Sequence, residues 1–172
     1  FQWTQATGMT PLATTGPLNE PFGGQPNVIS ADGSTVGGQS PEAWLWTAAG
    51  GLNFLGFNQA VYGLSADGSV AVGGDQWSGS GIAFIWDSVN GARPLQDYLQ
   101  NDLGLNISGW TLSAALGISD DGTKIVGVGT NPFGVQEAWY ADVTAVPEPA
   151  VFYQFLAGLL VLIGAVSRKL SI

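Results

Sequence analysis

Short runs of alternating apolar and polar residues, separated by glycine-rich turns, occupy most of residues 1–145. Runs of this length and period predict β-strands, because successive side chains of a strand point to opposite faces. Two segments depart from the pattern: residues 97–114 interrupt it, and residues 150–166 are apolar throughout apart from Gln154. The sequence therefore predicts an all-β body, residues 1–145, followed by a separate apolar tail.

The body contains an internal repeat whose most constant element is an Asp-Gly turn. Ser-Ala-Asp-Gly-Ser stands at 30–34 and at 65–69, and Ser-Asp-Asp-Gly-Thr stands at 119–123. Each turn is followed by a β-branched run that ends in glycine. Next come an aromatic run and then, in the first two repeats, a strand that begins with glycine; the aromatic runs are Ala43–Thr47, Ala83–Asp87 and Ala138–Tyr140. Residues 1–12 copy only the second half of this unit.

Each repeat is predicted to be a four-stranded antiparallel meander. Asp-Gly between two alternating runs is a strong hairpin signal, because the turn needs a positive φ that glycine accepts. Trp44 and Trp46 lie two residues apart and therefore share one face of their strand. The same period places the aromatic-run tryptophans in the core: Trp3, Trp46, Trp86 and Trp139. Three full repeats are fewer than the four to eight blades of common propellers, so a partial propeller, a sandwich-like stack and an open array all remain.

The interruption at 97–114 is predicted to be an insertion within the repeat pattern. Pro94 can open a short helix with Leu95, Leu99 and Leu103 on one face. Residues 110–112 then return to a strand.

Composition excludes several kinds of chemistry. The 172 residues include no His and no Cys. Ser-His-Asp or Cys-His catalysis, disulfides, and imidazole or thiolate metal sites are therefore excluded. The chain has 13 acidic and 4 basic residues, a net charge of −9. Such a surface repels phosphate backbones, so no nucleic-acid partner is expected.

The remaining candidates for chemistry are carboxylates. Calcium takes six to eight oxygen ligands, whereas the turns supply little more than one aspartate each, and turn formation explains those aspartates: Asp32, Asp67, Asp120 and Asp121. A glycosidase needs two carboxylates across a cleft. Glu42 and Glu137 hold equivalent repeat positions, so the repeat explains them, and Asp87 ends an aromatic run. We predict no enzymatic activity, no metal and no cofactor.

Two tryptophans outside the aromatic runs are candidates for stacking on a ligand. Trp77 lies in a polar loop and Trp110 follows a glycine. Exposed aromatic rings can stack on the faces of sugars, so the two are candidate sugar-binding residues. The alternative interpretation is that both cover the ends of the β-core.

The apolar tail is predicted to be a membrane anchor. As a helix, residues 150–166 reach about 25 Å at ~1.5 Å per residue, the short end of what a hydrocarbon core of about 30 Å requires. Aromatic residues at its start suit the interface, and a basic pair follows it. The anchor residues are Phe152, Phe155, Leu159, Leu160, Leu162, Arg168 and Lys169. The positive-inside rule places the C-terminus of residues 150–172 in the cytoplasm and the body outside.

The junction between body and tail is Val146, Pro147, Glu148 and Pro149. Two prolines around a glutamate predict an extended spacer, 146–149. The order of spacer, apolar span and basic pair resembles the PEP-CTERM sorting signal of Gram-negative bacteria. That resemblance implies recognition by a membrane protease-transpeptidase, exosortase, often in bacteria that make exopolysaccharide. The resemblance implies a cellular destination and an orientation in the membrane, and it implies no biochemical activity.

The body resembles HAF-type extracellular repeats of bacterial surface proteins, through its Ser-x-Asp-Gly turns, glycine-ended strands and Ala-aromatic-x-Trp runs. Residues 108–139 resemble the terminal repeat that often precedes a PEP-CTERM tail. Members of that family usually carry more repeats. This chain begins halfway through a repeat, which indicates either that sequence upstream of Phe1 is missing or that the N-terminal strands complete the last repeat. The absence of a recognisable signal peptide fits a processed or truncated start.

Together these observations predict a non-enzymatic, single-pass protein of the cytoplasmic (inner) membrane, with a structural β-module on its periplasmic or extracellular side. In one hypothesis it is an accessory subunit, packed through an intact tail against lipid and other membrane protein subunits, as in a photosynthetic or respiratory complex. In the other it is an exosortase-sorted surface or matrix protein that adheres to exopolysaccharide. The first is preferred, and a glycan-processing enzyme is a third, weaker hypothesis.

Overall fold

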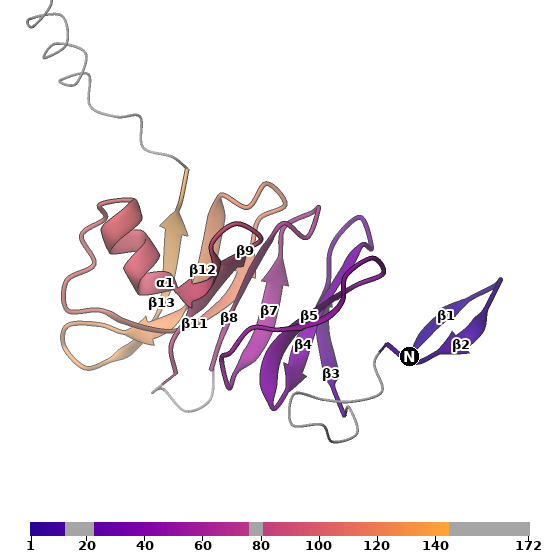
Figure 1. The fold of residues 1–172 in the computed structure, drawn as a ribbon. Coiled ribbons are helices and arrows are strands. Elements are labelled where there is room, and N and C mark those ends of the chain that lie inside the picture. Colours follow the sequence, from indigo (N-terminus) through magenta and orange to yellow (C-terminus); the bar gives the residue numbers. More distant parts are fainter. Residues whose placement is uncertain (13–22, 76–80, 145–172) are drawn as a thin grey trace, which may run out of the picture.

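The computed structural model describes residues 1–12, 23–75 and 81–144, and these residues form an all-β protein with one short helical segment (Figure 1). The strands are β1 (Gln2–Thr4), β2 (Gly8–Thr10), β3 (Gln25–Ile29), β4 (Thr35–Ser40), β5 (Glu42–Thr47), β6 (Gly51–Phe54), β7 (Ala60–Leu64), β8 (Val70–Gly74), β9 (Phe84–Asp87), β10 (Gly91–Pro94), β11 (Thr111–Ile118), β12 (Lys124–Thr130) and β13 (Gln136–Asp142). The helix α1 (Leu95–Asp97) continues as a π-helical turn, Tyr98–Asp102.

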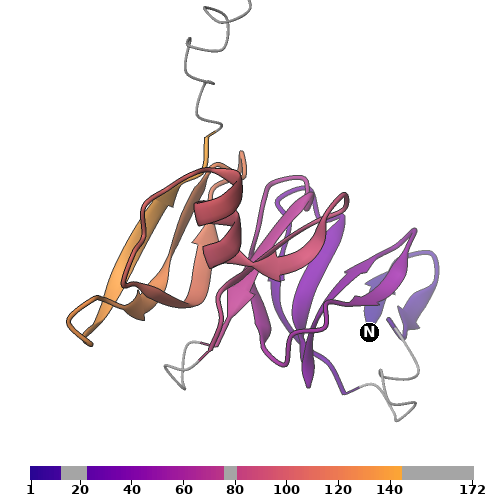
Figure 2. The same ribbon diagram turned by 60° about the vertical axis from the view of Figure 1, so that its left-hand side comes forward.

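The strands pair as three successive antiparallel units, which we call the first, second and third repeats. The first repeat is β3-β4-β5-β6 and the second is β7-β8-β9-β10, each a four-stranded meander as predicted. The third repeat, within the described residues, has the three strands β11-β12-β13. A single pair, Ala114 with Gly74, joins β11 to β8. Figures 1 and 2 show the repeats following one another across the molecule in sequence order.

The strand that precedes each aromatic run is glycine-ended for a steric reason. Gly73 of β8 lies opposite Phe84 of β9, and a Cβ at Gly73 would lie 2.6 Å from the Phe84 ring and 2.1 Å from the Ala60 carbonyl oxygen. The same arrangement recurs in the other repeats, at Gly38 with Trp44 and at Gly127 with Trp139. Real Cβ atoms do not approach other atoms so closely, so each aromatic ring requires a glycine beneath it.

The N-terminal hairpin, β1 and β2, pairs only with itself among the described residues. The prediction that Trp3 is a core residue is wrong, because its exposed fraction is 67%. Trp46 and Trp86, at the equivalent position, are half-buried, as is Trp139. The hairpin corresponds to strands three and four of a repeat, and among the described residues no second strand pairs with it to cover Trp3.

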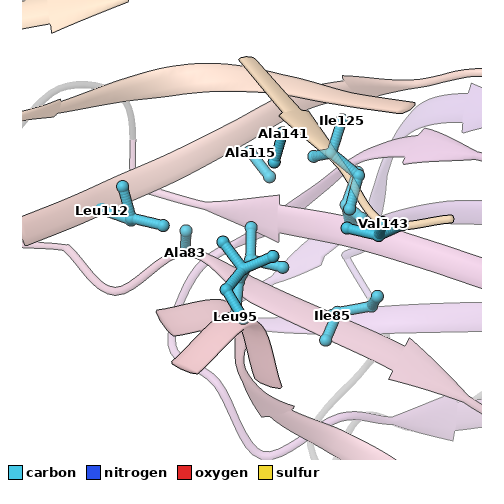
Figure 3. Packing of buried hydrophobic residues seen from close by; sticks show 10 residues of the cluster. Ala83, Ile85, Leu95, Leu112, Ala115, Ile125, Ala141 and Val143 are labelled. Atoms are coloured by element: carbon cyan, nitrogen blue, oxygen red, sulfur yellow. The ribbon is translucent and has the colours of Figure 1, made fainter. Parts of the chain in front are cut away.

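The core consists of two clusters, one at each junction between repeats. Between the first and second repeats, Leu45, Val61 and Phe84 are buried together, and the Phe57 and Phe84 rings stack at 4.9 Å between centroids. Between the second and third, the helical insertion contributes Leu95 and Leu99. These join buried side chains from five strands and from Ala83, which immediately precedes β9. Figure 3 shows Ala83 with the strand residues Ile85, Leu112, Ala115, Ile125 and Ala141. The predicted helix and its leucine face are confirmed, with Leu103 packed at the edge.

Candidate functional site

The three Asp-Gly turns have the same internal hydrogen bonds. In the second repeat, the backbone N–H of Val70 donates to Ser65 Oγ at 3.0 Å, and Ser65 Oγ donates to Asp67 Oδ1 at 2.8 Å. The N–H of Ser69 also donates to Asp67 Oδ1, at 3.0 Å. The equivalent bonds form in the first turn around Asp32 and in the third around Asp121. The serine and the aspartate that define the repeat therefore hold their own turn closed.

The turns of neighbouring repeats also touch one another. The N–H of Asp32 donates to the Ala66 carbonyl at 3.0 Å, and the N–H of Ala66 donates to the Asp120 carbonyl at 2.9 Å. A Cβ at Gly68 would lie 2.2 Å from Thr35 Oγ1 of the preceding repeat. The turns thus form a continuous row along one end of the repeats.

The turn carboxylates are held as anions by these bonds. The backbone N–H of Ser69, then the hydroxyls of Ser69 and Ser65, lower the pKa of Asp67 to about 2. The Ser119 hydroxyl and the Thr123 N–H and hydroxyl do the same for Asp121, also to about 2. Their oxygens accept bonds from the protein itself, and the described residues contain no group of three or more candidate metal ligands.

A hollow of about 300 Å³ lies beside Trp110, at the free edge of β13. Its walls come from the helical insertion, the 106–110 loop, β11 and β13: Leu99, Asn106, Ile107, Trp110, Leu112, Ala138, Trp139, Tyr140 and Ala141. In the first two repeats the corresponding edge of the third strand pairs with a fourth strand, β6 or β10. The hollow therefore occupies a place where the described part of the third repeat has no fourth strand.

The hollow combines aromatic surface with a few polar groups. Trp110 is half-buried and Tyr140 has an exposed fraction of 62%. The buried Nε1 of Trp139 has no hydrogen-bond partner among the described residues. Asn106 Oδ1 accepts the Ser108 N–H at 3.1 Å, which fixes the loop that carries Trp110. Aromatic walls with sparse hydrogen-bonding groups suit an uncharged sugar or an apolar side chain.

The carboxylates weighed for hydrolysis belong to different repeats, Glu42 to β5, Asp87 to β9 and Glu137 to β13. Burial raises the pKa of Asp87, but bonds from Arg93 and Asn90 outweigh it and lower the pKa to about 2. Arg93 Nη1 lies 2.7 Å from Asp87 Oδ2, and its guanidinium stacks over Tyr98 at 4.9 Å. Asp87 therefore anchors the turn between β9 and β10 to the helical insertion.

Of the two candidate sugar-binding tryptophans, Trp110 lies in the described part of the structure, in the hollow. Trp77, the spacer 146–149 and the anchor residues of 150–172 lie outside the described residues. In residues 1–12, 23–75 and 81–144 no helix has the length and apolar character needed to cross a membrane.

The structure also reveals a surface that the sequence analysis missed, on the face of the third repeat turned away from the second. We call Val126, Val128, Ala138 and Tyr140 the outward face. Val126 and Tyr140 have exposed fractions of 47% and 62%, whereas the equivalent Val72 and Ile85 of the second repeat have 0% and 4%. Aligning the three repeats and asking which residues meet a following repeat would have found it.

Comparisons with known proteins provide little further information. No protein-family model matches the chain, and no curated protein matches it. Among solved structures, TolB from Acinetobacter baumannii is similar with a TM-score of 0.47 and 18% sequence identity. The match covers 74% of this chain and 32% of the TolB chain, so this chain spans about a third of that protein's length.

Proposed function

We propose that the protein is a non-enzymatic structural module that acts by contact, outside the cytoplasmic membrane. One observation carries this proposal. The serines and aspartates that define the repeats are bonded within their own turns, so what the body offers a partner is surface. That surface includes the apolar outward face and the aromatic hollow beside Trp110. The succession of meanders, packed face to face, supports a propeller-like arrangement left open at the third repeat.

The C-terminal segment supplies the proposed anchor. Residues 150–166 would cross the membrane as a helix, with Arg168 and Lys169 on the cytoplasmic side. Support comes from the order of Pro-Glu-Pro spacer, apolar span and basic pair, which resembles a PEP-CTERM signal.

In the principal version, the tail is retained and the protein is an accessory subunit of a larger membrane complex. An apolar face on the body supports a protein partner. The test is intact-mass spectrometry on native membranes that are solubilised gently and separated by size. The full-length chain should migrate with stoichiometric partners. A free chain truncated near Pro149 would overturn this version and support the sorted surface protein instead.

The hollow beside Trp110 favours a second version, in which the sorted protein adheres to exopolysaccharide. The net charge of −9 repels acidic polymers, so the ligand would be a neutral glycan. Titration calorimetry of the full chain in detergent should give binding to cellohexaose and none to alginate oligomers. Trp110→Ala should reduce the affinity about tenfold or more, the value of one aromatic stack of roughly 1.4 kcal/mol, and Val89→Ala should not. Unchanged affinity in Trp110→Ala would exclude the hollow.

A further inference from the structure

The outward face of the third repeat has the residue pattern of a repeat junction. Gly37, Val72 and Val126 are equivalent, because each lies one residue before the strand glycine that faces the aromatic ring. The first two meet the following repeat. A Cβ at Gly37 would lie 2.7 Å from Val61 Cγ1, and Val72 is buried in one cluster with Ala115. Val126, the third member, is exposed.

The opposite end of the chain carries the complementary surface. Pro26 of the first repeat is equivalent to Val61 and Ala115. Val61 lies beside Gly37 of the preceding repeat, and Ala115 is buried in one cluster with Val72 of the preceding repeat. Pro26 is exposed, and Ile29 beside it has an exposed fraction of 60%. The N-terminal hairpin pairs only with itself among the described strands, and Phe1, Pro11 and Leu12 line a hollow of about 380 Å³ together with Pro26 and Trp44.

We propose that the outward face binds the first repeat of a second copy of this chain, so that copies associate head to tail. The junction would repeat the two already present within the chain, with Val126 of one copy on Pro26 of the next. This inference rests on the proposed structural function and names the partner of the outward face. Such a contact is heterologous, so it generates a ring or a filament.

Charge at the junction supports this choice of partner. Thr35 and Val70 lie against the turn glycines of the following repeats, Gly68 and Gly122. The equivalent residue of the third repeat is Lys124, whose Nζ lies 3.1 Å from Asp142 at the rim of the outward face. A second copy docked in the same register would place the Asp32 turn beside Lys124. The Lys124 ammonium, which already donates to Thr123, Asp142 and Thr144 of its own chain, thus stands where the neighbouring turn would supply an exposed carboxylate. This contact would favour the partner and its register.

Single cysteines test the register directly, because the chain has none of its own. Full-length Val126→Cys and Pro26→Cys chains, mixed in detergent under mild oxidation, should form a disulfide-linked dimer. Phe133→Cys, which is 89% exposed on the turn between β12 and β13, is the matched control and should not link to Pro26→Cys. A Val126→Cys chain that links only to itself would indicate a symmetric dimer and overturn the head-to-tail arrangement.

Sedimentation velocity over a range of protein concentrations provides the second measurement. The full chain should associate as its concentration rises, and Tyr140→Asp should shift it to monomer. Val89→Asp, at a site that is 87% exposed on another turn, should not. A folded chain that stays monomeric and forms no Val126–Pro26 disulfide overturns the inference. If that chain still fractionates with membranes and partners, the proposed function stands without it.

Discussion

The second and third repeats contain the same signals and differ in what surrounds them. Each has a Ser-x-Asp-Gly turn, a glycine-ended strand and an aromatic residue opposite the glycine. In the second repeat a fourth strand completes the sheet, and both faces meet a neighbouring repeat. In the described part of the third, β13 is an edge and one face is open. The contrast separates what a repeat specifies by itself from what its neighbours supply.

Internal geometry belongs to the repeat itself. The turn hydrogen bonds and the packing of the aromatic ring on glycine are alike in both units. Burial, in contrast, depends on the neighbour: Ile85 is 4% exposed and its equivalent Tyr140 is 62% exposed. Such arrays gain stability from each interface between repeats, so the first and third repeats, which each meet one other repeat among the described residues, should be less stable than the second.

The largest effect should come from filling a strand glycine, and it should be alike in the two repeats. Gly73→Val and Gly127→Val each place a side chain within 2.6 Å of an aromatic ring and 2.1 Å of a carbonyl oxygen. We expect each to lower the free energy of unfolding by about 3 kcal/mol or more. Gly23→Ala, with nothing within 4 Å of its Cβ, should cause no loss. Urea denaturation followed by tryptophan fluorescence measures all three.

Equivalent positions on the outer face of the third strand should differ most between the repeats. Ile85→Ala removes a buried side chain between the second and third repeats and should cost about 2 to 4 kcal/mol. Tyr140→Ala removes an exposed one and should change the stability of the monomer by less than about 0.5 kcal/mol. If the two variants lost equal stability in dilute protein, the outward face would be covered in the monomer, and this result would contradict the structure.

A smaller effect is expected at the turn serines. Ser65 is buried, and its hydroxyl receives the Val70 N–H while donating to Asp67. Ser65→Ala removes both hydrogen bonds and should lower the free energy of unfolding by about 1 to 2 kcal/mol. Ser119→Ala should cost less, because water reaches the third turn and replaces the lost bonds. A larger loss for Ser119 than for Ser65 in urea titrations would contradict the assigned burial.

Acid should weaken the turns of both repeats to a small extent. Asp67, Asp121 and Asp142 each have a folded pKa of about 2, below the ordinary value of 3.8. A lowered folded pKa stabilises the folded state above the unfolded pKa, and this contribution is lost as the pH falls from about 4 to about 2. The urea midpoint should therefore decline across that window. Asp67→Asn with Asp121→Asn should flatten the decline, whereas an unchanged slope would show that other groups cause it.

The features that sequence predicted best are local. Asp-Gly requires a positive φ, and Gly33, Gly68 and Gly122 adopt φ of 72°, 66° and 72°. The leucine spacing after Pro94 similarly predicted the short helix and its buried face. In each case the residues that decide the structure lie within one turn of one another, so the pattern alone was sufficient.

The features that sequence missed depend on distant neighbours. Trp3 has the same local pattern as Trp46, yet it is exposed because, within residues 1–12, 23–75 and 81–144, no second strand pairs with its hairpin. The first strands carry a register shift at equivalent residues, Asn27, Tyr62 and Leu116, which no turn signal marks. Trp110 was a candidate by its loop position, but the hollow beside it also depends on Leu99 and on β13, which lie more than ten residues away along the chain.

Native-state hydrogen exchange of the dilute full-length chain in detergent, read by mass spectrometry, tests the central claim most directly. Among the described residues, the third repeat is covered on one face only and β13 is an edge strand. The β13 amides should therefore exchange much faster than those of β8, with β12 in between. Rates in dilute protein that are equally slow across β8, β12 and β13 would contradict this claim, because the outward face and the β13 edge would then already be covered within a single chain.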